Sequence, residues 1–264
     1  MNSVYMNLYL KETGQNNPET ILFLHGSSLA GWMWDEQVAA VNEYHCIVPD
    51  LPEHGKSQEI EPFSIESAAE MMVDLIKTRA HDGKAHLVGI SLGAQLIVQI
   101  LSTAPEVVDR AFISGTLVHG VPAAETFLKL LDYLLNTYLP IKNDNLSIGS
   151  YIRSYNIPKN LVRKFKESTY IIQSESAERI IRENILFKIP VGLENADVPV
   201  LVMVGEKDHR IVKESAKNLI NILPNSKGAT ALKVGHMWNM ENPELFNKVL
   251  RTFLNNTGCL LYKN

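Results

Sequence analysis

The stretch Ala85-His86-Leu87-Val88-Gly89-Ile90-Ser91-Leu92-Gly93 decides how this chain should fold. It opens with an apolar run typical of a buried strand, and a segment of helical spacing follows up to residue 102. Ser91 lies at the turn between the two, within the pattern Gly-x-Ser-x-Gly. Such a turn is tight, so its flanking positions must be small, and it pushes the serine hydroxyl out above the sheet. The pattern alone is moderately specific, and its strand-to-helix setting strengthens it.

Outward from this turn, short apolar runs alternate with helical segments along the chain of 264 residues. The apolar runs cover residues 21–24, 46–48, 85–88, 111–113 and 200–204, and the helical segments cover residues 64–79, 92–102, 212–223 and 243–254. Near-continuous apolar runs suit strands that are covered on both faces, and the alternation predicts parallel strands joined by crossover helices. We expect residues 4–10 to add an antiparallel strand at one edge.

The alternation breaks after residue 116. Residues 117–197 are helical and irregular, and a strand pattern returns at residue 200. We therefore expect one core domain, formed by residues 1–116 and 198–264, with residues 117–197 inserted as a helical cap. The first cap helix, at about residues 123–139, has more apolar side chains than one core-facing stripe needs. We favour packing on the core over contact with a substrate as the explanation for these extra apolar side chains.

The composition excludes several classes of function. A formal net charge of −4, with no stripe of Lys and Arg, gives no field that would collect phosphates, so nucleic acid is not an expected partner. The two cysteines, Cys46 and Cys259, support neither a disulfide framework nor a thiolate zinc site, and no His-Glu-x-x-His helix points to a metal. The first residues lack a secretory pattern and no apolar run suits a membrane span, so we expect a cytoplasmic protein.

A serine hydroxyl needs a base to take its proton, and the base needs a carboxylate to hold it. Asp208 lies in the polar turn Gly205-Glu206-Lys207-Asp208-His209, at the carboxyl end of a predicted parallel strand. His236 lies in a loop before the final helix and can reach the same rim. The chain order Ser91, Asp208, His236 matches the order expected when the serine occupies such a turn. We predict these three residues as nucleophile, acid and base.

Other residues could take these roles. Glu206 is an alternative carboxylate, and Glu194 and Asp197 are weaker ones because they precede the strand. His209 is the competing base, but it adjoins the predicted acid on one loop, where it cannot easily contact both the acid and the serine. The remaining histidines are expected at the surface, in loops or within a strand.

Attack of the serine on a carbonyl builds negative charge on oxygen, which preorganised N–H groups must meet. One expected donor is the backbone N–H of Leu92. The second should come from the turn after the first buried strand, which reads His25-Gly26-Ser27-Ser28, and we assign it to the N–H of Ser27. Alternatively, Gly26 serves only to make a tight turn and the segment has no role in binding the oxyanion. We expect His25 to pack and to form hydrogen bonds rather than to act as a base.

Several parts of the chain resemble the α/β-hydrolase superfamily. They are His25-Gly26, residues 49–57, residues 89–93, Asp208 and Gly235-His236, and together they span nearly the whole chain. In relatives the segment 49–57 usually contains Asp-x-Pro-Gly-His-Gly-x-Ser, and here Glu53 replaces the first glycine. His54 and Ser57 look structural by analogy. The resemblance implies an α/β class protein with the α/β-hydrolase fold, in which a mostly parallel sheet is flanked by helices and a helical cap is inserted.

The resemblance also implies acyl transfer from a small-molecule substrate to water, without a cofactor. Similar capped proteins include esterases, thioesterases, lactonases, C–C bond hydrolases and perhydrolases, whereas dehalogenases and epoxide hydrolases use aspartate at the turn. We expect cleavage of a small to medium carboxylic ester through an acyl-enzyme on Ser91. A C–C bond hydrolase would need a carboxylate-binding group such as Arg153, Arg163 or Arg210. A slow ligand-binding or signalling protein is the alternative from another class.

Apolar residues near the predicted site indicate a partly apolar substrate. Trp32 and Trp34 follow the oxyanion turn, and Met237 and Trp238 follow the base. Together with Phe127 and Leu131 of the predicted cap helix, they are the candidates for the substrate pocket. Core packing is an equally weighted alternative for these side chains.

Overall fold

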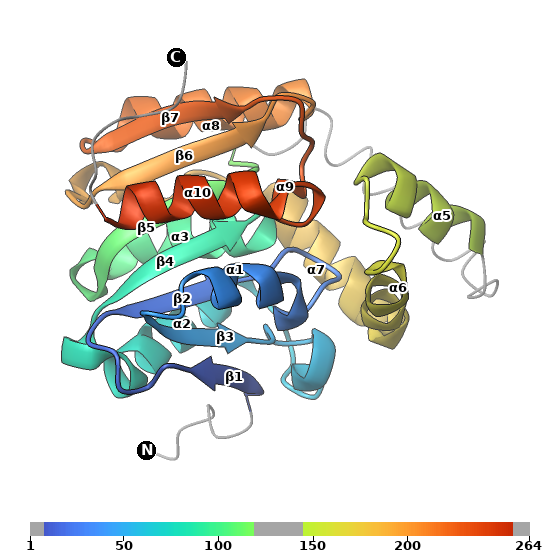
Figure 1. Cartoon of the computed structure of the whole chain (residues 1–264), viewed down its shortest axis with the longest axis horizontal. Helices are drawn as coiled ribbons and strands as arrows, with labels where there is room; N and C mark the ends of the chain where they lie inside the picture. Colours follow the sequence, from blue (N-terminus) through green and yellow to red (C-terminus); the bar gives the residue numbers. More distant parts are fainter. Residues whose placement is uncertain (1–7, 119–144, 256–264) are drawn as a thin grey trace.

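The structure is a computed structural model that describes residues 8–118 and 145–255. In this part of the chain, seven strands form one sheet in the order β1-β3-β2-β4-β5-β6-β7 (Figure 1). The strands are β1 (Leu10–Thr13), β2 (Thr20–Leu24), β3 (His45–Pro49), β4 (Ala85–Ile90), β5 (Val108–Ser114), β6 (Val200–Gly205) and β7 (Ser226–Ala231). β1 pairs antiparallel with β3, and the other neighbouring strands pair in parallel.

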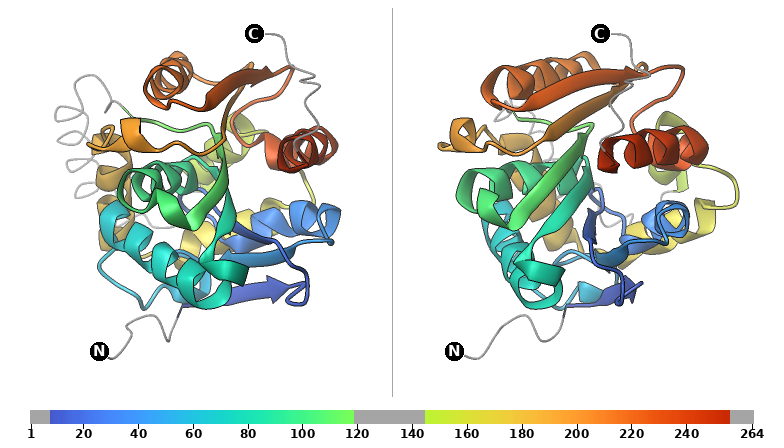
Figure 2. Two further views of the ribbon diagram at one scale, coloured as in Figure 1. Left: turned by 90° about the vertical axis from the view of Figure 1, so that its left-hand side faces the viewer. Right: turned by 60° about the vertical axis from the view of Figure 1, so that its left-hand side comes forward.

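Helices cover both faces of the sheet (Figure 2). They are α1 (Asp35–Ala40), α2 (Ile65–Arg79), α3 (Leu92–Thr103), α5 (Asn145–Ser154), α6 (Val162–Ile171), α7 (Ser174–Leu186), α8 (Arg210–Ile222), α9 (Trp238–Glu241) and α10 (Pro243–Leu254). Successive side chains of a strand point to opposite faces. Leu22 and Leu24 of β2 therefore pack in the cluster under α2, α3 and α8, whereas Ile21 and Phe23 pack in the cluster under α1 and α10.

The predicted fold class is confirmed, and most predicted elements are present. Each of the five apolar runs lies inside a strand, and the four predicted helices correspond to α2, α3, α8 and α10. The antiparallel edge strand is β1, which begins at Leu10 rather than at residue 4, and residues 1–7 lie outside the described part. β7 has no counterpart among the predicted strands, because its sequence Ser-Lys-Gly-Ala-Thr-Ala has no apolar run.

Between β5 and β6 the structure describes α5, α6 and α7, where the sequence predicts an inserted cap at residues 117–197. The predicted first cap helix, with Phe127 and Leu131, lies outside the described residues.

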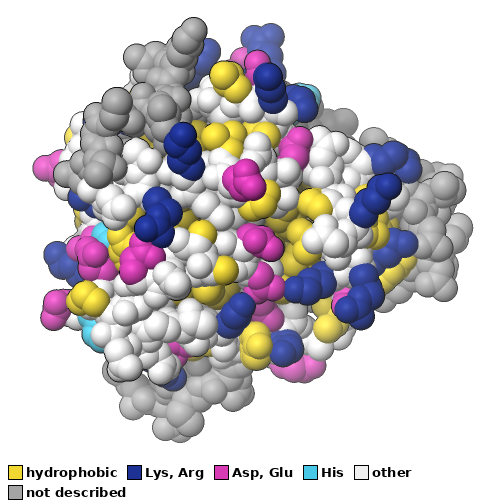
Figure 3. Space-filling model, viewed as in Figure 1, with side chains coloured by type: hydrophobic (Ala, Val, Ile, Leu, Met, Phe, Trp, Pro, Cys, Tyr) yellow, Lys and Arg dark blue, Asp and Glu magenta, His cyan; other side chains and the backbone are white. Residues whose placement is uncertain are grey.

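Figure 3 shows acidic and basic side chains intermingled over much of one face, with Lys and Arg gathered over α5 and α6 at the right. No helix in the two described ranges is both long and apolar enough to cross a membrane.

Partly buried polar contacts attach α7 to the core. Nδ2 of Asn184 donates to Oε1 of Gln95 in α3 at 2.9 Å. Oε2 of Glu183 accepts the backbone N–H of Ile65, the first residue of α2, at 2.8 Å. An N–H in the first turn of a helix has no acceptor within the helix, so the carboxylate of Glu183 satisfies it from outside. α7 is thus fixed to two different core helices.

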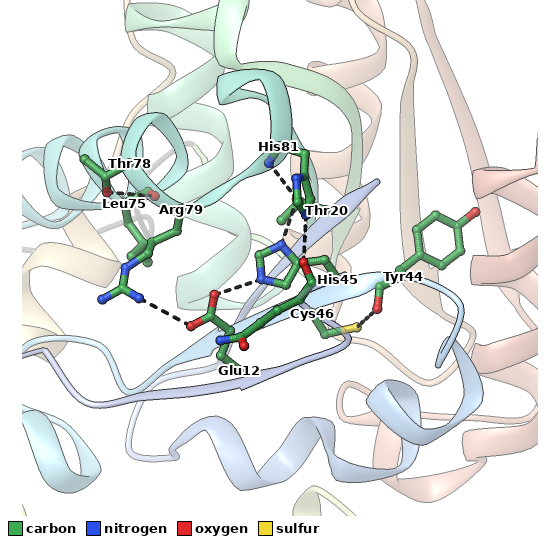
Figure 4. Close-up of polar contacts among 10 residues, drawn as sticks. Glu12, Thr20, Tyr44, His45, Cys46, Leu75, Thr78, Arg79 and His81 are labelled. Atoms are coloured by element: carbon green, nitrogen blue, oxygen red, sulfur yellow. Dashed lines mark hydrogen bonds and ion pairs between the residues drawn. The ribbon is translucent and has the colours of Figure 1, made fainter. Parts of the chain in front are cut away.

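A second polar network joins β1, β2, β3 and α2 at the amino ends of the parallel strands (Figure 4). The buried ring of His45 contacts Oγ1 of Thr20 through Nδ1 at 3.1 Å and Oε1 of Glu12 through Nε2 at 2.8 Å. Arg79, the last residue of α2, lies 3.6 Å from the other carboxylate oxygen of Glu12. These contacts lie at the opposite end of the parallel strands from their carboxyl ends. They stabilise the edge of the sheet because they join the edge strand β1 to β2, β3 and α2.

Candidate active site

Ser91 lies directly after β4 and before the first turn of α3. Its φ of 55° and ψ of −115° are rarely adopted by a residue with a side chain, and such strain costs about 1–3 kcal/mol. Backbone hydrogen bonds hold the turn. The N–H of Ser91 donates to the carbonyl of Ser114 at 2.9 Å, and the carbonyl of Ser91 accepts the N–H of Gln95 at 3.1 Å. The surroundings therefore impose the strained conformation on the serine.

Both glycines of the turn are sterically required. A Cβ on Gly93 would lie 2.1 Å from the carbonyl oxygen of Leu24 in β2. A Cβ on Gly89 would lie 2.6 Å from the carbonyl oxygen of Gly93. Real Cβ atoms do not approach backbone atoms so closely, so α3 can pack on β2 and β4 only with glycine at these two positions.

Asp208 and His236 are joined by a 2.7 Å hydrogen bond between Oδ1 of the carboxylate and Nδ1 of the imidazole. The other carboxylate oxygen, Oδ2, accepts the N–H of Gly205 at 2.8 Å. The side chain of Asp208 is 2% exposed and that of His236 is 15% exposed. The carboxylate is therefore fixed, while the ring stays accessible. A neutral imidazole that donates from Nδ1 has an unprotonated Nε2, which is the state a general base needs.

The loops that hold the acid and the base are attached to each other. The N–H of Lys207 donates to the carbonyl of Val234 at 2.9 Å. A Cβ on Gly205 would lie only 2.3 Å from the carbonyl oxygen of Gly235. Each of these four residues lies within three positions of Asp208 or His236. Backbone packing thus brings the carboxylate and the imidazole together.

Ser91, Asp208 and His236 line one cavity of about 500 Å³, a volume typical of small-molecule sites. Gly115, which follows β5, lines it as well and has a φ of 61°. A Cβ at Gly115 would lie 2.9 Å from Cε1 of His236. The structure thus places the three predicted residues around one space, and the imidazole fits there because residue 115 is glycine.

Tyr155 is a cavity residue that the sequence does not reveal. It directly follows α5, and its ring centroid lies 5.6 Å from that of His236 with an angle of 36° between the planes. Burial, with smaller effects from Tyr151 and Asp208, raises the pKa of Tyr155 to about 12, so its hydroxyl stays protonated. Ile148, Ile152 and Tyr155 have helical spacing and pack against one core cluster, but no local sequence signal indicates that Tyr155 reaches the histidine.

One predicted oxyanion donor directly follows the serine in the chain, and the turn of the other comes close to it. Leu92 is the first residue of α3, and an N–H in the first turn has no acceptor within the helix. The turn after β2 approaches from the other side, since a Cβ on Gly26 would lie 3.6 Å from Cβ of Ser91. The N–H of Gly26 itself contacts Sδ of Met33 at 3.5 Å. Ser27 is next in the chain and half-buried, and its N–H stays a prediction for the second donor.

His25 fixes the turn after β2, in line with the role expected for it. Its Nε2 accepts the N–H of Leu51 at 2.9 Å, so the proton lies on Nδ1, which donates to the carbonyl of Gly26 at 2.8 Å. The ring is fully buried, and burial lowers the pKa of His25 to about 4. His25 is therefore neutral at pH 7 and occupied on both nitrogens.

Four of the residues predicted for the substrate pocket are described, and they are not among the described residues that line the cavity. Trp34 and Trp238 are 0% exposed and pack on Phe246 in the core, with ring centroids 5.7 and 4.5 Å from its ring. Trp32 donates from Nε1 to a serine hydroxyl of α6 at 2.7 Å, and Met237 is buried next to the turn after β2. Core packing, the alternative weighed for these side chains, accounts for Trp34 and Trp238, because burying large apolar side chains in the core is strongly favourable. The apolar lining of the cavity comes from Leu117, Ile211 and Val212.

The alternative acid and base have other surroundings. Oε2 of Glu206 accepts the N–H of Lys233 at 2.7 Å, so this carboxylate supports the loop before the histidine. His209 lines the cavity, but the hydrogen bond to the carboxylate of Asp208 comes from His236. The geometry favours the acid and base predicted from the sequence over these alternatives.

Glu53, which stands where relatives usually have glycine, adopts the left-handed conformation of a glycine, with a φ of 62°. Its side chain is 0% exposed. Nε of Arg179 in α7 lies 3.1 Å from both carboxylate oxygens, and Nη2 makes a still closer contact with Oε1. The departure from the family pattern is therefore an ion pair, buried on the carboxylate side, between the loop after β3 and the segment between β5 and β6.

Comparison with known proteins identifies the family. The model of the alpha/beta hydrolase fold family matches residues 19–243. An AB hydrolase superfamily protein of Gibberella zeae is 38% identical over 104 residues, which make up 38% of this chain and 37% of that protein. The putative carbamate hydrolase RutD of Yersinia enterocolitica is 24% identical over 94% of this chain and 92% of its own length.

Two further similar proteins have esterase in their names. The carboxylesterase YbfK of Bacillus subtilis is 25% identical over 92% of this chain and 82% of its own length. The structure of a thermophilic esterase from Thermogutta terrifontis superposes with a TM-score of 0.78 at 19% identity, covering 94% of this chain and 93% of that one. At this identity, the structural likeness concerns the fold alone. With the family model matched over residues 19–243, this chain belongs to the alpha/beta hydrolase fold family and is an enzyme.

Proposed function

We propose that this enzyme is a serine hydrolase that cleaves small to medium carboxylic esters through an acyl-enzyme on Ser91. One observation carries the proposal. Asp208 and His236 are hydrogen-bonded at 2.7 Å beside a cavity that Ser91 also lines from its strained turn. A serine with an imidazole base and a carboxylate that orients the base is an activated nucleophile.

In the proposed mechanism, Nε2 of His236 takes the proton of Ser91 as Oγ attacks the carbonyl carbon. Asp208 holds the ring and stabilises the imidazolium that forms. The N–H groups of Leu92 and Ser27 stabilise the oxyanion, and one such donor is worth about 100- to 1000-fold in rate. The imidazolium protonates the leaving alcohol as the C–O bond breaks. The same ring then deprotonates a water molecule, which attacks the acyl-enzyme, and it returns this proton to Oγ of Ser91 as the acid is released.

The cavity supports a substrate of modest size. Its volume of about 500 Å³ and its apolar lining suit a small to medium, partly apolar acyl or alcohol group. We infer that residues 117–197 act as a cap over this site, because Tyr155 of that segment lies against the imidazole of His236. The names of the two esterase relatives support an ester substrate, and the carbamate hydrolase makes carbamates the nearest alternative to test.

The arginines that a C–C bond hydrolase could use do not line the cavity. Arg163 is 84% exposed and Arg210 is 89% exposed, and each pairs with a glutamate one turn further along its own helix. Arg153 is also absent from the residues that line the cavity. These three arginines therefore give no support for a diketo acid substrate, and Lys207, which does line the cavity, is the side chain that could bind such a carboxylate.

A fluorophosphonate probe and a series of p-nitrophenyl esters test the proposal. The wild type should react with the probe and hydrolyse short to medium esters. Ser91→Ala should not react and should lose about 10⁴-fold or more in kcat. Ser102→Ala is the matched control, because Ser102 lies in the same helix and its Oγ bonds to the carbonyl of Gln99. Rapid ester cleavage by Ser91→Ala would refute the mechanism.

The same experiment separates the other functions. Faster turnover of p-nitrophenyl carbamates or of a vinylogous diketo acid than of any ester would replace the ester substrate and keep the nucleophile. Labelling of Ser91 without useful turnover of any ester, thioester or lactone would favour a slow binding or signalling protein on the same fold.

A further inference from the structure

Three segments that flank the proposed catalytic residues meet at one carboxylate, that of Glu241. Glu241 is the last residue of α9, and its side chain is 17% exposed. Its Oε2 accepts the N–H of Gly235 at 2.7 Å. Its Oε1 accepts Nδ2 of Asn156 at 3.3 Å and lies 3.8 Å from Nζ of Lys207.

Each partner of this carboxylate is the direct neighbour of a residue at the cavity. Gly235 precedes the base, Lys207 precedes the acid, and Asn156 follows Tyr155, whose ring lies against the base. A single side chain therefore contacts the loop of the acid, the loop of the base and the inserted segment. Hydrogen bonds to an ionised acceptor are shorter and about twice as strong as neutral ones, so the carboxylate suits this role.

The carboxylate of Glu241 packs closely against the backbone of Gly235, so neither group can move far without breaking the contact. A Cβ there would lie 3.3 Å from Oε2 of Glu241, which shows how closely the carboxylate packs on the backbone before His236. A shift of about 1 Å in the position of a catalytic group can cost about 100-fold in rate. Loss of the carboxylate would release the backbone that sets the position of the imidazole.

We propose that Glu241 is a positioning residue, which holds the loop of His236 in register with the loop of Asp208 and with the inserted segment. The inference rests on the proposed serine hydrolase function. Glu241 is not among the described residues that line the cavity, so it acts on the reaction through the placement of the imidazole. Its loss should slow the deprotonation of Ser91 and leave the substrate cavity in place.

Glu241→Ala, Glu241→Gln and the control Glu244→Ala test this role. Glu244 is an exposed glutamate three residues further on, so its variant has the same change of charge. Glu241→Ala should lower kcat on a p-nitrophenyl ester about tenfold or more, with KM within about twofold, and should lower the rate of fluorophosphonate labelling equally. Glu241→Gln should recover most of kcat because its amide oxygen can still accept the N–H of Gly235. Glu244→Ala should match the wild type.

The labelling endpoint counts the folded sites, whereas the labelling rate reports how well the serine is activated. A purely structural role would lower the endpoint and the melting temperature and leave the rate for each folded site unchanged, which would overturn the inference. If Glu241→Ala does not fold, Glu241→Asp keeps the charge but is one methylene shorter, so it should also lose kcat, and wild-type kcat in that variant would overturn the inference. A failure of the function itself appears separately, as an unlabelled wild type or an active Ser91→Ala.

Discussion

Arg179→Met tests the buried ion pair that replaces the glycine of the family pattern. The variant keeps a long side chain on α7 but removes the guanidinium, which contacts both carboxylate oxygens of Glu53. The carboxylate of Glu53 is 0% exposed, so it cannot turn to water without local opening. Glu61, the other carboxylate near Arg179 at 3.9 Å, is 67% exposed and stays hydrated in the variant.

The expected cost can be worked out from the charge that stays behind. Removal of one partner of a buried ion pair typically costs about 3–5 kcal/mol. Protonation of the remaining acid would limit the part of this cost that comes from the unpaired charge. A glutamic acid in water has a pKa of about 4.3, so keeping a carboxyl group neutral at pH 7 costs about 3.7 kcal/mol. Since Arg179 is 34% exposed, some water can reach the site, and we expect a loss of about 2–3 kcal/mol.

Urea unfolding and thermal melts at two pH values measure this loss. At pH 7, the melting temperature should fall by about 5–10 °C. At pH 5, the cost of a neutral carboxyl group is only about 1 kcal/mol, so most of the difference from the wild type should disappear. Arg163→Met is the control, because its ion pair is exposed and should change stability by less than about 0.5 kcal/mol. An equal loss at pH 5 and pH 7, or a loss no larger than in the control, would refute the reasoning.

Two further predictions concern the catalytic cavity and the buried histidines. Gly115→Ala should lower kcat about tenfold or more, because its Cβ would lie 2.9 Å from Cε1 of His236. Gly83→Ala, at a similar φ of 66° with open space around it, should leave kcat unchanged. Burial lowers the pKa of His25 to about 4 and that of His54 to about 3, whereas an unfolded histidine titrates near 6.5. The unfolded chain thus binds more protons below pH 6.5, and the free energy of unfolding should fall as the pH drops toward 4. His54→Gln should fall less steeply over this range in urea unfolding, and an unchanged slope would contradict the assignment.

The parts of the fold with a local signal could be predicted from the sequence. α10 begins at Pro243 and ends at Leu254, as predicted, because proline suits the first turn and Oδ1 of Asn242 accepts the N–H of Leu245 at 3.1 Å. The turn at Ser91 could be predicted because its glycines are required by packing within a few residues of chain. Asp208 could be placed near it because it follows a predicted strand of the same parallel sheet, and His236 because its loop precedes the final helix.

The parts that depend on distant contacts could not be predicted. β7 becomes a strand through its pairing with β6, and its own residues are small or polar. The tryptophans next to the oxyanion turn and the base have the composition of a pocket, but Trp34 and Trp238 gain more from full burial on Phe246. The contact of Tyr155 with His236 depends on where α5 ends in space, which no spacing in the sequence encodes.

The effect on stability of having Glu53 where relatives have glycine depends on the segment between β5 and β6. A glutamate at a φ of 62° is strained, and a buried carboxylate without a cation is costly, so the residue alone would destabilise the loop after β3. Arg179 of α7 removes the second cost, and its two contacts with the carboxylate fix α7 over the same loop. With glycine at position 53, the loop would lose its strain but α7 would lose this attachment. The two positions lie in different predicted domains, yet the cost of a change at one depends on the residue at the other.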